Sequence, residues 1–329
     1  MSSFINLDKN DQFSVLRGID LQDLLNQVDN YLLKYRDTLS LPQHITFGVE
    51  IEYENASRFI TDAYIKTKFP SWDSKIDSSV RSGGEIISPI MTDKKEYWEQ
   101  LKKICDHLSR RRASTSGNAG GHIHVGTNLL GDDIKAWTTF SKLYVAYENV
   151  IFRFIYGDKI NGRKNIGKYA KPIADTIYEP LMETKKIKNL MDLYMIMPFY
   201  DRYQAVNFTN IYFDNYKVYK NTIEFRGPNA TTSPIIWQNN INAFTKMLKS
   251  SKDNVIDVDF LDYKLNHEYI SYSNNEYLYE CINLKNVLEF VDLIFDNNLD
   301  KICFLRQYLK NFQEVYGAQE TVHAKKFIR

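Results

Sequence analysis

The chain has 329 residues, of which 43% are hydrophobic and 25% are charged. These values are ordinary for a globular protein, and they exclude a chain that is disordered along most of its length. The 42 basic and 41 acidic residues leave a net charge of +1. A balance this close excludes a strong long-range field that would draw the protein to nucleic acid or to an acidic membrane.

The cysteines and the apolar residues bear on where the protein is located. Cys105, Cys281 and Cys303 are an odd set without a CxxC motif, which favours a reducing compartment over a disulfide framework. The first residues contain no apolar stretch typical of a signal peptide. No run of about eighteen apolar residues predicts a membrane span. We therefore expect a cytoplasmic protein.

The N-terminal part of the chain predicts one helix and two strands. Apolar residues at helical spacing predict an amphipathic helix over residues 19–37, which ends before Pro42. The sequence ITFGVEIEY alternates apolar residues with others and predicts a strand over residues 45–53. Residues 76–90 predict a turn followed by a second strand, since two glycines precede EIISP.

The middle of the chain is richer in helix. An apolar stripe predicts a helix over residues 93–112, and glycines then precede a short strand, HIHVGTN. A second helix is predicted from about Asp132 to Tyr156. A polar loop is expected over residues 157–180, and a short helix over residues 186–196.

The C-terminal part returns to strands before it becomes helical. Strands are predicted over residues 203–213 and 217–226. A helix over residues 233–249 begins with serine and proline, which suit its first turn. The segment 284–312 is strongly helical. Because the strands and helices do not form tight βαβ units, we expect an α+β fold with a largely antiparallel sheet.

Three of the predicted strands carry polar residues two positions apart. The pairs are Glu50 with Glu52, His122 with His124, and Glu224 with Arg226. Side chains at positions i and i+2 of a strand point to the same face, so each pair presents two functional groups side by side. The residues between them, Ile51, Ile123 and Phe225, point to the other face and suit a core.

Together the pairs predict a metal site that handles phosphate. Neighbouring carboxylates repel in a low-dielectric space and become favourable around a divalent cation. Carboxylates with an imidazole suit Mg²⁺ or Mn²⁺, and Arg226 would neutralise phosphates in a phosphoryl transfer from a nucleotide. Each pair alone has a simpler explanation: an exposed strand face, two hydrogen-bonded histidines, or a surface ion pair. The three pairs in one chain favour the site.

The same segments resemble the amidoligase family, a branch of the superfamily of glutamine synthetase and glutamate–cysteine ligase. The matching pieces are FGVEIEYE at 47–54, DSSVRSGGEIISP at 77–89, GGHIHVG at 120–126, RYQAVN at 202–207 and TIEFRGPNAT at 222–231. The resemblance covers residues 45 to about 250. It implies a glutamine-synthetase-like catalytic domain, in which helices pack on a curved, largely antiparallel sheet and the concave face holds the metal ions and ATP.

The resemblance also implies boundaries and residue roles. Residues 1–44 would be an N-terminal helical extension, residues 45–250 the catalytic domain, and residues 251–329 a mainly helical C-terminal segment. The implied metal ligands are Glu50, Glu52, Glu85, His122 and Glu224. His124 would lie close to the ATP phosphates or the substrate, and Arg226 with Arg202 would hold the transferred phosphoryl group. The implied substrate contacts are Asp77, Ser79 and Asn207.

The activity that the resemblance implies is an ATP-dependent ligation. A carboxylate and an amine, borne by a small molecule, a peptide or a protein, would be joined through an acyl phosphate with two or more Mg²⁺ or Mn²⁺ ions. Relatives are often multimers, so a homo-oligomer is left open, while no nucleic-acid or membrane partner is expected. The residues also leave open a metal-dependent hydrolase, a guanidino kinase, or a non-catalytic scaffold that retains the fold.

One polar segment adds basic charge near the expected site. Residues 157–171 contain Lys159, Arg163, Lys164, Lys168 and Lys171. The spacing of Gly157 and Gly162 approaches a phosphate-binding loop, but Arg163 stands where that motif has lysine, and no serine or threonine follows it. We therefore interpret the segment as a basic loop that meets phosphates or an acidic substrate, with a plain solvated loop as the simpler alternative.

Overall fold

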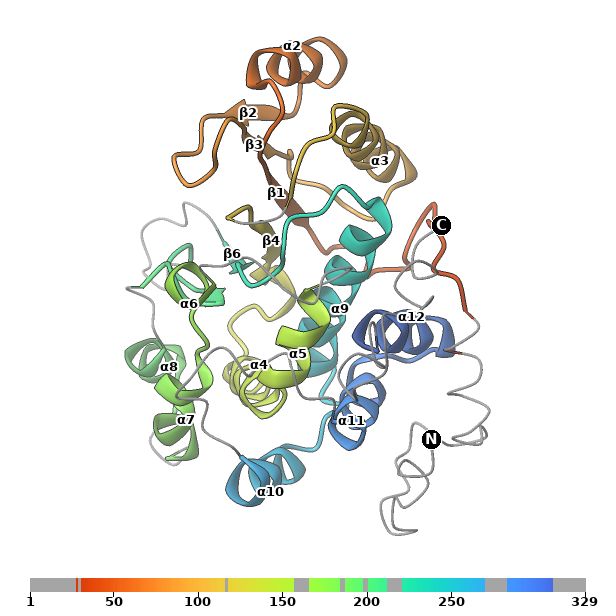
Figure 1. Cartoon of the computed structure of the whole chain (residues 1–329). Helices are drawn as coiled ribbons and strands as arrows, with labels where there is room; N and C mark the ends of the chain where they lie inside the picture. Colours follow the sequence, from red (N-terminus) through yellow and green to blue (C-terminus); the bar gives the residue numbers. More distant parts are fainter. Residues whose placement is uncertain are drawn as a thin grey trace, which may run out of the picture.

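The computed structural model describes residues 28, 31–115, 118–156, 166–183, 187–197, 201–211, 221–269 and 283–309. Figure 1 shows their arrangement, with the strands in the upper part and most helices below and beside them. The strands are β1 Phe47–Tyr53, β2 Asp73–Lys75, β3 Gly84–Ile87, β4 Gly121–Gly126, β5 Val206–Asn207 and β6 Thr222–Phe225. The helices are α2 Arg58–Lys68, α3 Lys95–Arg110, the 3₁₀ helix η3 Thr127–Leu129, α4 Ile134–Ala146, α5 Glu148–Ile155, α6 Ile166–Tyr169, α7 Ala174–Met182, α8 Leu190–Ile196, α9 Pro234–Lys252, α10 Val258–Glu268, α11 Leu284–Ile294 and α12 Asn298–Tyr308.

The strands form one open sheet in the order β2-β3-β1-β4-β6-β5. Every pair of neighbouring strands is antiparallel. The expected α+β class with a largely antiparallel sheet is therefore confirmed. In this order β1, β4 and β6, which carry the three polar pairs, lie next to one another at the centre of the sheet.

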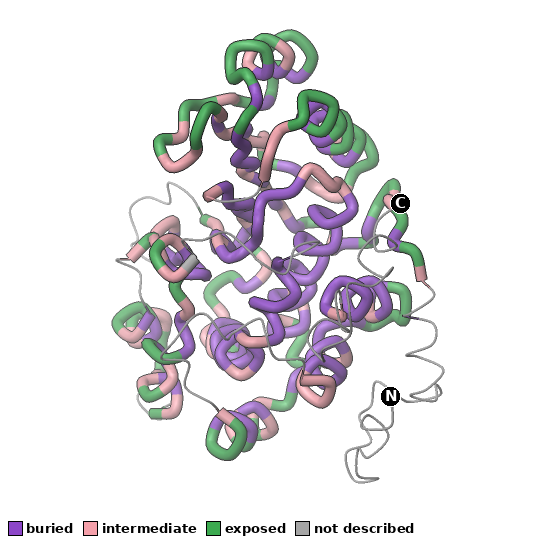
Figure 2. Tube along the Cα trace, in the orientation of Figure 1, coloured by how far each residue is buried: buried purple, intermediate pink, exposed green. Residues whose placement is uncertain are grey.

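One face of the sheet packs on helices. Val49, Ile51 and Ile123 are at most 1% exposed, because they point away from the polar pairs into the core. The Phe225 ring of β6 stacks on Phe244 of α9, with ring centroids 3.9 Å apart. Figure 2 shows α9 buried along most of its length beside the buried central strands. This packing fixes which face of β1, β4 and β6 is left for the polar side chains.

The helices that cover this face are those with the clearest apolar stripes in the sequence. The prediction over residues 93–112 is confirmed by α3, whose Trp98 and Leu101 are fully buried. The prediction over residues 233–249 is confirmed by α9, which continues to Lys252. No helix in the described part of the chain is both long and apolar enough to cross a bilayer.

The N-terminal helix prediction is wrong at its C-terminal end. Residues 31–37 form no helix, whereas Val28 is helical and residues 19–27, 29 and 30 lie outside the described residues. Side chains from elsewhere bind the backbone here: Gln238 of α9 accepts from the Arg36 N–H at 3.0 Å and donates to the Arg36 carbonyl at 2.6 Å. Asp93 accepts from the Leu39 N–H at 2.9 Å. These bonds replace those that a helix would supply.

The single helix predicted from Asp132 to Tyr156 is two helices, α4 and α5, with a break at Tyr147. The break lets the Tyr147 hydroxyl donate to Glu289 at 3.0 Å. The following residue, Glu148, is buried and accepts the backbone N–H groups of Ile173 and Ala174 at the start of α7. Tertiary hydrogen bonds therefore divide the continuous helical pattern.

The loop predicted over residues 157–180 is partly wrong, because it contains α6 and most of α7. Residues 157–165, including Lys159, Arg163 and Lys164, lie outside the described residues. Ile177 and Leu181, four residues apart, are buried on one face of α7. The helix was hidden in the sequence because Pro180 lies inside it, and proline ordinarily ends a helix.

The later strands are shorter than predicted. Within the described residues 203–211 only Val206–Asn207 is a strand, because the Asn207 side chain accepts the Thr209 N–H at 2.9 Å and turns the backbone. Residues 212–220 lie outside the described residues. The short helix expected over 186–196 is confirmed by α8.

The long C-terminal helix predicted over residues 284–312 is two helices, α11 and α12. The chain leaves helical geometry after Ile294, and the Asn297 side chain then accepts the Asp300 N–H at 2.9 Å to cap α12. Residues 310–312 lie outside the described residues. An N-capping asparagine inside a helical pattern therefore marked a boundary that the apolar spacing did not.

Candidate functional site

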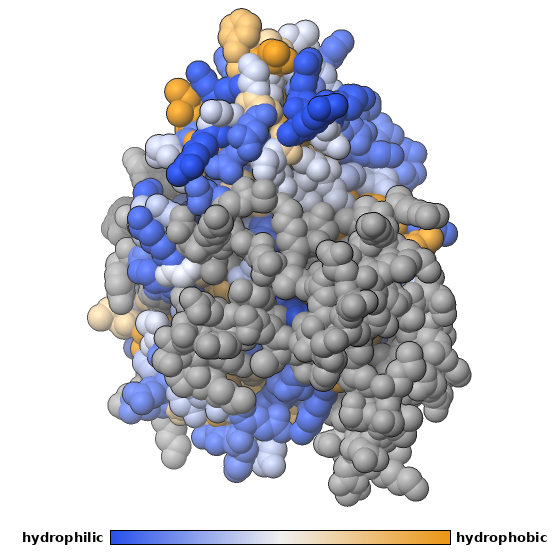
Figure 3. All heavy atoms as spheres, viewed as in Figure 1, coloured by the Kyte–Doolittle hydropathy of each residue, from blue (hydrophilic) through white to orange (hydrophobic). Residues whose placement is uncertain are grey.

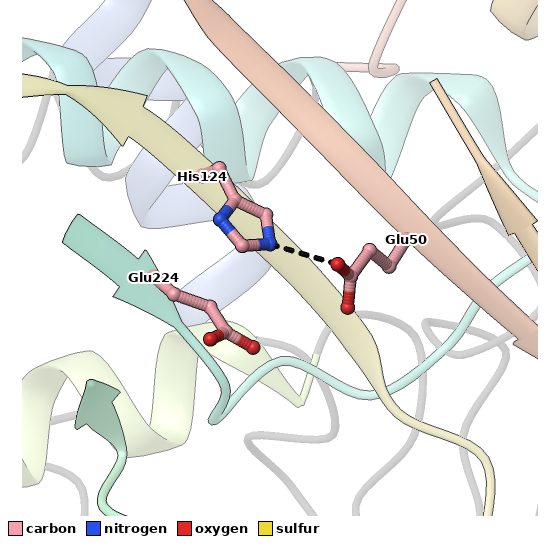
Figure 4. A group of neighbouring side chains, drawn as sticks. All are labelled: Glu50, His124 and Glu224. Atoms are coloured by element: carbon pink, nitrogen blue, oxygen red, sulfur yellow. Dashed lines mark hydrogen bonds and ion pairs between the residues drawn. The ribbon is translucent and has the colours of Figure 1, made fainter. Parts of the chain in front are cut away.

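The polar pairs of the central strands lie on one face of the sheet. In the antiparallel register Glu50 of β1 is opposite His122 of β4, and His124 of β4 is opposite Glu224 of β6. Directly opposed residues of neighbouring strands share a face. Figure 4 shows Glu50, His124 and Glu224 pointing into one space from three strands, with His124 bonded to Glu50. The prediction that these side chains converge is therefore correct.

His122 lies at the centre of the carboxylates. Its Nδ1 atom is 2.9 Å from Glu50 Oε2 and 3.5 Å from Glu224 Oε1. Its Nε2 atom is 3.4 Å from Glu52 Oε1. The imidazole is only 3% exposed, so it is enclosed by carboxylates from β1 and β6.

His124 contacts a second oxygen of the same glutamate. Its Nε2 atom lies 3.1 Å from Glu50 Oε1, and its Nδ1 atom lies 3.3 Å from Thr222 Oγ1. The two ring nitrogens therefore hold the imidazole between β1 and β6. Glu50 is shared by both histidines, which makes it the carboxylate with the most contacts to the imidazoles.

Glu224 is held by two side chains from the β5 edge of the sheet. Arg226 donates from Nη1 to Glu224 Oε1, and Asn207 donates from Nδ2 to Oε2 at 2.6 Å. Arg226 also donates from Nε to the Tyr169 carbonyl at 3.3 Å. The predicted residues Asn207 and Arg226 are thus both at the site, and both orient the buried Glu224 carboxylate.

A second acidic group lies on the β3 side. Glu52 and Glu85 are opposite each other in the register, and Asp77 approaches both from the loop between β2 and β3. The Ser79 backbone N–H donates to Asp77 Oδ1, which holds the carboxylate in place. Ser79 therefore contributes through its backbone. Asp77, which the resemblance implied as a substrate contact, lies instead with the candidate metal ligands Glu52 and Glu85.

Three overlapping groups of ligand atoms result. In each, one atom from each of three residues lies within 4.8 Å of the other two. The groups are Glu50, His124 and Glu224; Glu50, Glu85 and His122; and Glu52, Asp77 and Glu85. Carboxylate oxygens with few imidazole nitrogens are the donor set that Mg²⁺ and Mn²⁺ accept.

A buried nitrogen that lacks a hydrogen bond also supports a cation at this site. The His122 Nε2 atom is buried and makes no hydrogen bond within the part of the chain that the structure describes. A buried polar atom without a hydrogen bond is costly. A metal ion among these carboxylates would satisfy this nitrogen and offset their mutual repulsion.

The pKa values of two glutamates reflect their neighbours. Burial acts to raise the pKa of Glu50, but hydrogen bonds to His122 and His124 outweigh it and hold that pKa far below its usual range. Burial also acts to raise the pKa of Glu224, and the charges of His122 and Arg226 lower it overall. Both carboxylates therefore remain ionised at neutral pH, which is the form that binds cations.

Glu85 behaves in the opposite way. Burial is the largest cause, and the nearby charges of Glu50, Glu52 and Asp77 add to it, so that the pKa of Glu85 rises to about 8. The carboxylates on the β3 side of the site are therefore not neutralised by nearby positive charges. A cation bound there would reverse this shift.

We predict that the metal-free protein loses stability as pH rises toward about 8, because of Glu85. The folded state binds the Glu85 proton more tightly than the unfolded state, whose carboxyl has the ordinary value of 4.5. The contribution of this proton to the free energy of unfolding is fully present below pH 4.5 and is lost as pH rises through about 8. Urea unfolding of wild type and Glu85→Gln across this range measures it.

The variant supplies the control, since glutamine stays neutral at every pH. As pH rises, the free energy of unfolding of Glu85→Gln should increase relative to that of the wild type. Adding Mn²⁺ at neutral pH should also release more protons in the wild type than in the variant, which calorimetry in buffers of different ionisation enthalpy detects. Parallel pH profiles for the two proteins would contradict the assignment.

Within the described residues Arg202 makes no hydrogen bond or ion pair with the three ligand groups, although the charge of Glu224 acts on it. Its side chain is exposed, and its Nη2 atom donates to the Tyr203 hydroxyl at 2.8 Å. It therefore has different neighbours from Arg226, with which sequence reasoning had paired it. The basic residues Lys168 and Lys171 are near it, on α6 and on the segment that follows.

Sequence reasoning missed three contributors to the site. Thr222 belongs to the same alternation as Glu224 and Arg226, so a longer period-two pattern would have included it. Gly120 donates its N–H to Glu52 Oε2, and Tyr169 supplies its carbonyl to Arg226. These last two act through the backbone, and no side-chain pattern in the sequence indicates such a role.

Comparison with known proteins identifies the family. A family model described as "Putative amidoligase enzyme" matches residues 59–248, which is more than half of the chain. The matched region runs from the start of α2 into α9 and includes β2 to β6, so β1 with Glu50 and Glu52 precedes it. No curated protein sequence matches the chain. The suspected family is thereby confirmed: the chain belongs to the amidoligase family.

Proposed function

We propose that the protein is an ATP-dependent carboxylate–amine ligase that uses divalent cations. Membership of the amidoligase family supports an enzyme of the ligase type. The observation that carries the proposal is the set of three overlapping ligand groups linked through Glu50 and Glu85. Overlapping groups suit two or more adjacent cations, which is the arrangement that phosphoryl transfer from ATP requires.

Some residues of this face would bind the cations, and others would contact the phosphates. Glu50, Glu52, Glu85, His122 and Glu224 would hold Mg²⁺ or Mn²⁺, with Asp77 as a further ligand on the β3 side. Bound cations would neutralise the charge of the ATP phosphates. Arg226, fixed between Glu224 and the Tyr169 carbonyl, would place its guanidinium against the transferred phosphoryl group. His124 would face the phosphates beside Glu50.

The reaction that this arrangement suits has two steps. A carboxylate oxygen of the acid substrate attacks the γ-phosphorus of ATP, ADP leaves, and an acyl phosphate forms. The amine nitrogen then attacks the acyl carbon, inorganic phosphate leaves, and the nitrogen loses a proton to give the amide. Position and electrostatic stabilisation account for most catalysis in such transfers. Coupling to ATP supplies the driving force that amide formation in water lacks.

The proposal is tested first by binding. A non-hydrolysable ATP analogue should bind in calorimetry when Mg²⁺ or Mn²⁺ is present and should not bind in excess chelator. The protein is then incubated with ATP, Mg²⁺ and pooled amino acids or cell extract, and ADP and new amide masses are followed. A protein that binds no nucleotide with either cation is not this ligase, and a free acid or a phosphoguanidine as the product would reassign the reaction.

A further inference from the structure

A group of basic and tyrosine side chains lies beside Arg226, at the β5 edge of the sheet. We call Lys168, Tyr169, Arg202 and Tyr203 the cationic shelf. Lys168 and Tyr169 belong to α6, and Arg202 and Tyr203 lie just before β5. Lys168 and Arg202 are exposed, and the two tyrosines are half-buried. The shelf is therefore open to a ligand while its aromatic floor is held in place.

Backbone hydrogen bonds fix the two halves of the shelf to each other. The Lys171 N–H donates to the Tyr203 carbonyl at 2.8 Å, and the Ala205 N–H donates to the Lys171 carbonyl at 2.7 Å. The Tyr169 carbonyl accepts from Arg226, and the Arg226 N–H donates to the Ala205 carbonyl at 2.8 Å. The shelf is thus continuous with the residue proposed to hold the phosphoryl group.

Each half of the shelf places a cation over an aromatic ring. The Lys168 Nζ atom is 4.9 Å from the centroid of the Tyr169 ring, and the Arg202 Cζ atom is 4.9 Å from that of the Tyr203 ring. The two rings meet edge to face, with centroids 5.6 Å apart. The shelf therefore offers two separate cationic anchors joined by an apolar surface.

The acidic residues nearby are already occupied. Asp201 pairs with Lys171 at 3.1 Å and accepts from Gln204 at the same distance. Glu224 pairs with Arg226. In the described residues, Lys168 and Arg202 have no carboxylate within ion-pair distance. The hydrogen bond from Arg202 is the largest cause that lowers the pKa of Tyr203, and the charges of Arg202, Arg226 and Lys168 act in the same direction.

The ligand follows from two cations that have no ion pair within the described residues and are joined by aromatic rings. Each anchor suits one carboxylate, and the rings suit the apolar stems that carry carboxylates along a chain. Nucleic acid fits less well, because its binding requires many phosphate contacts and the chain as a whole is nearly neutral. We propose that the cationic shelf binds the carboxylate side chains of an acidic peptide, which is the carboxylate substrate of the ligase; this second part rests on the proposed function.

Fluorescence anisotropy of labelled peptides tests the proposal on the full-length protein. A fluorescein-labelled tetraglutamate should bind more tightly than a labelled tetraglutamine. Arg202→Gln and Lys168→Gln should each weaken tetraglutamate binding by about tenfold, the effect of losing one charge-assisted contact. Lys103→Gln, which removes an exposed lysine from α3, is the matched control and should leave the affinity unchanged.

The same variants separate this proposal from the ligase proposal. Binding of Mg²⁺ with the ATP analogue should be equal in the wild type and Lys168→Gln. Equal affinity for the two peptides, preferential binding of a labelled oligothymidylate, or loss of nucleotide binding in Lys168→Gln would overturn the peptide assignment. If the wild type binds tetraglutamate selectively but no nucleotide, the ligase proposal fails and the shelf remains a peptide site.

Discussion

Replacing Glu50 with glutamine is expected to weaken Mn²⁺ binding by at least about a hundredfold. Changes to the outer partners of metal ligands already cost on the order of 10–100-fold in affinity, and Glu50 is a direct candidate ligand in two of the three groups. Glutamine keeps the shape and one oxygen but removes the charge that offsets a divalent cation. Calorimetric titration of Mn²⁺ into the metal-free protein measures the change.

The size of the effect follows from what Glu50 touches. Its two oxygens contact different histidines, His122 at 2.9 Å and His124 at 3.1 Å. Removing its charge therefore disturbs both imidazoles as well as the cation. The ATP analogue, which is proposed to bind with the cation, should lose affinity in parallel.

Glu54→Gln is the matched control for this prediction. Glu54 is the next carboxylate after Glu52 in the same alternation, and it is also buried. It belongs to none of the three ligand groups, and it accepts the Arg81 N–H at 3.0 Å, which glutamine also accepts. Mn²⁺ affinity should therefore change little. Unchanged affinity in Glu50→Gln would mean that Glu50 is not a ligand of Mn²⁺. An equal loss in Glu54→Gln would mean that Mn²⁺ responds to the overall negative charge near this strand and not to the position of Glu50.

The composition of the site could be predicted from the sequence because it depends on a local rule. Alternation along a strand places Glu50 with Glu52, and His122 with His124, on one face whatever the rest of the chain does. The intervening Ile51 and Ile123 are apolar and were expected to point into a core. The polar pairs were therefore expected on the opposite face of the sheet. The central strands, the antiparallel class and the face that carries the candidate ligands could therefore be predicted from the sequence.

The register between strands was not accessible in the same way. That Glu50 is opposite His122, and not one pair further along, depends on how β1 and β4 pair across more than seventy intervening residues. The position of Asp77 depends likewise on the turn between β2 and β3. Sequence reasoning therefore identified Asp77 as a polar contact but not its place beside Glu52 and Glu85.

A helix that buries few apolar residues was not predicted from the sequence. Helix α2 buries only Thr61 and Ile65, while Phe59 is 82% exposed. Figure 3 shows apolar side chains gathered on the surface over α2, among hydrophilic neighbours. Its boundary is set instead by Ser57, whose hydroxyl accepts from the Ile60 N–H. Such a helix is stabilised by its cap and its contact with β2, and neither produces an amphipathic pattern.

Replacing Arg226 with glutamine is expected to lower the rate of ADP formation by about 10²–10³-fold, the range found when one stabilising donor is removed from a transition state. The guanidinium is 15% exposed and already oriented by Glu224 and Tyr169, so little reorganisation is needed when charge develops on the phosphoryl group. The KM for ATP should change much less, because the cations bind the ground-state phosphates. Initial rates of ADP release at varied ATP, with the acid and amine pool that supports turnover, give both constants.

Two further variants show whether position or charge is responsible. Arg226→Lys keeps the charge but cannot bond Glu224 and the Tyr169 carbonyl with one planar group, so it should restore only part of the rate. Arg110→Gln, an exposed arginine of α3, should match the wild type. If Arg226→Gln instead raises the KM and leaves the maximal rate intact, the guanidinium binds the ground state alone. Its bond to Glu224 would then serve to orient a metal ligand, and the charge needed in the transition state would have to come from the cations.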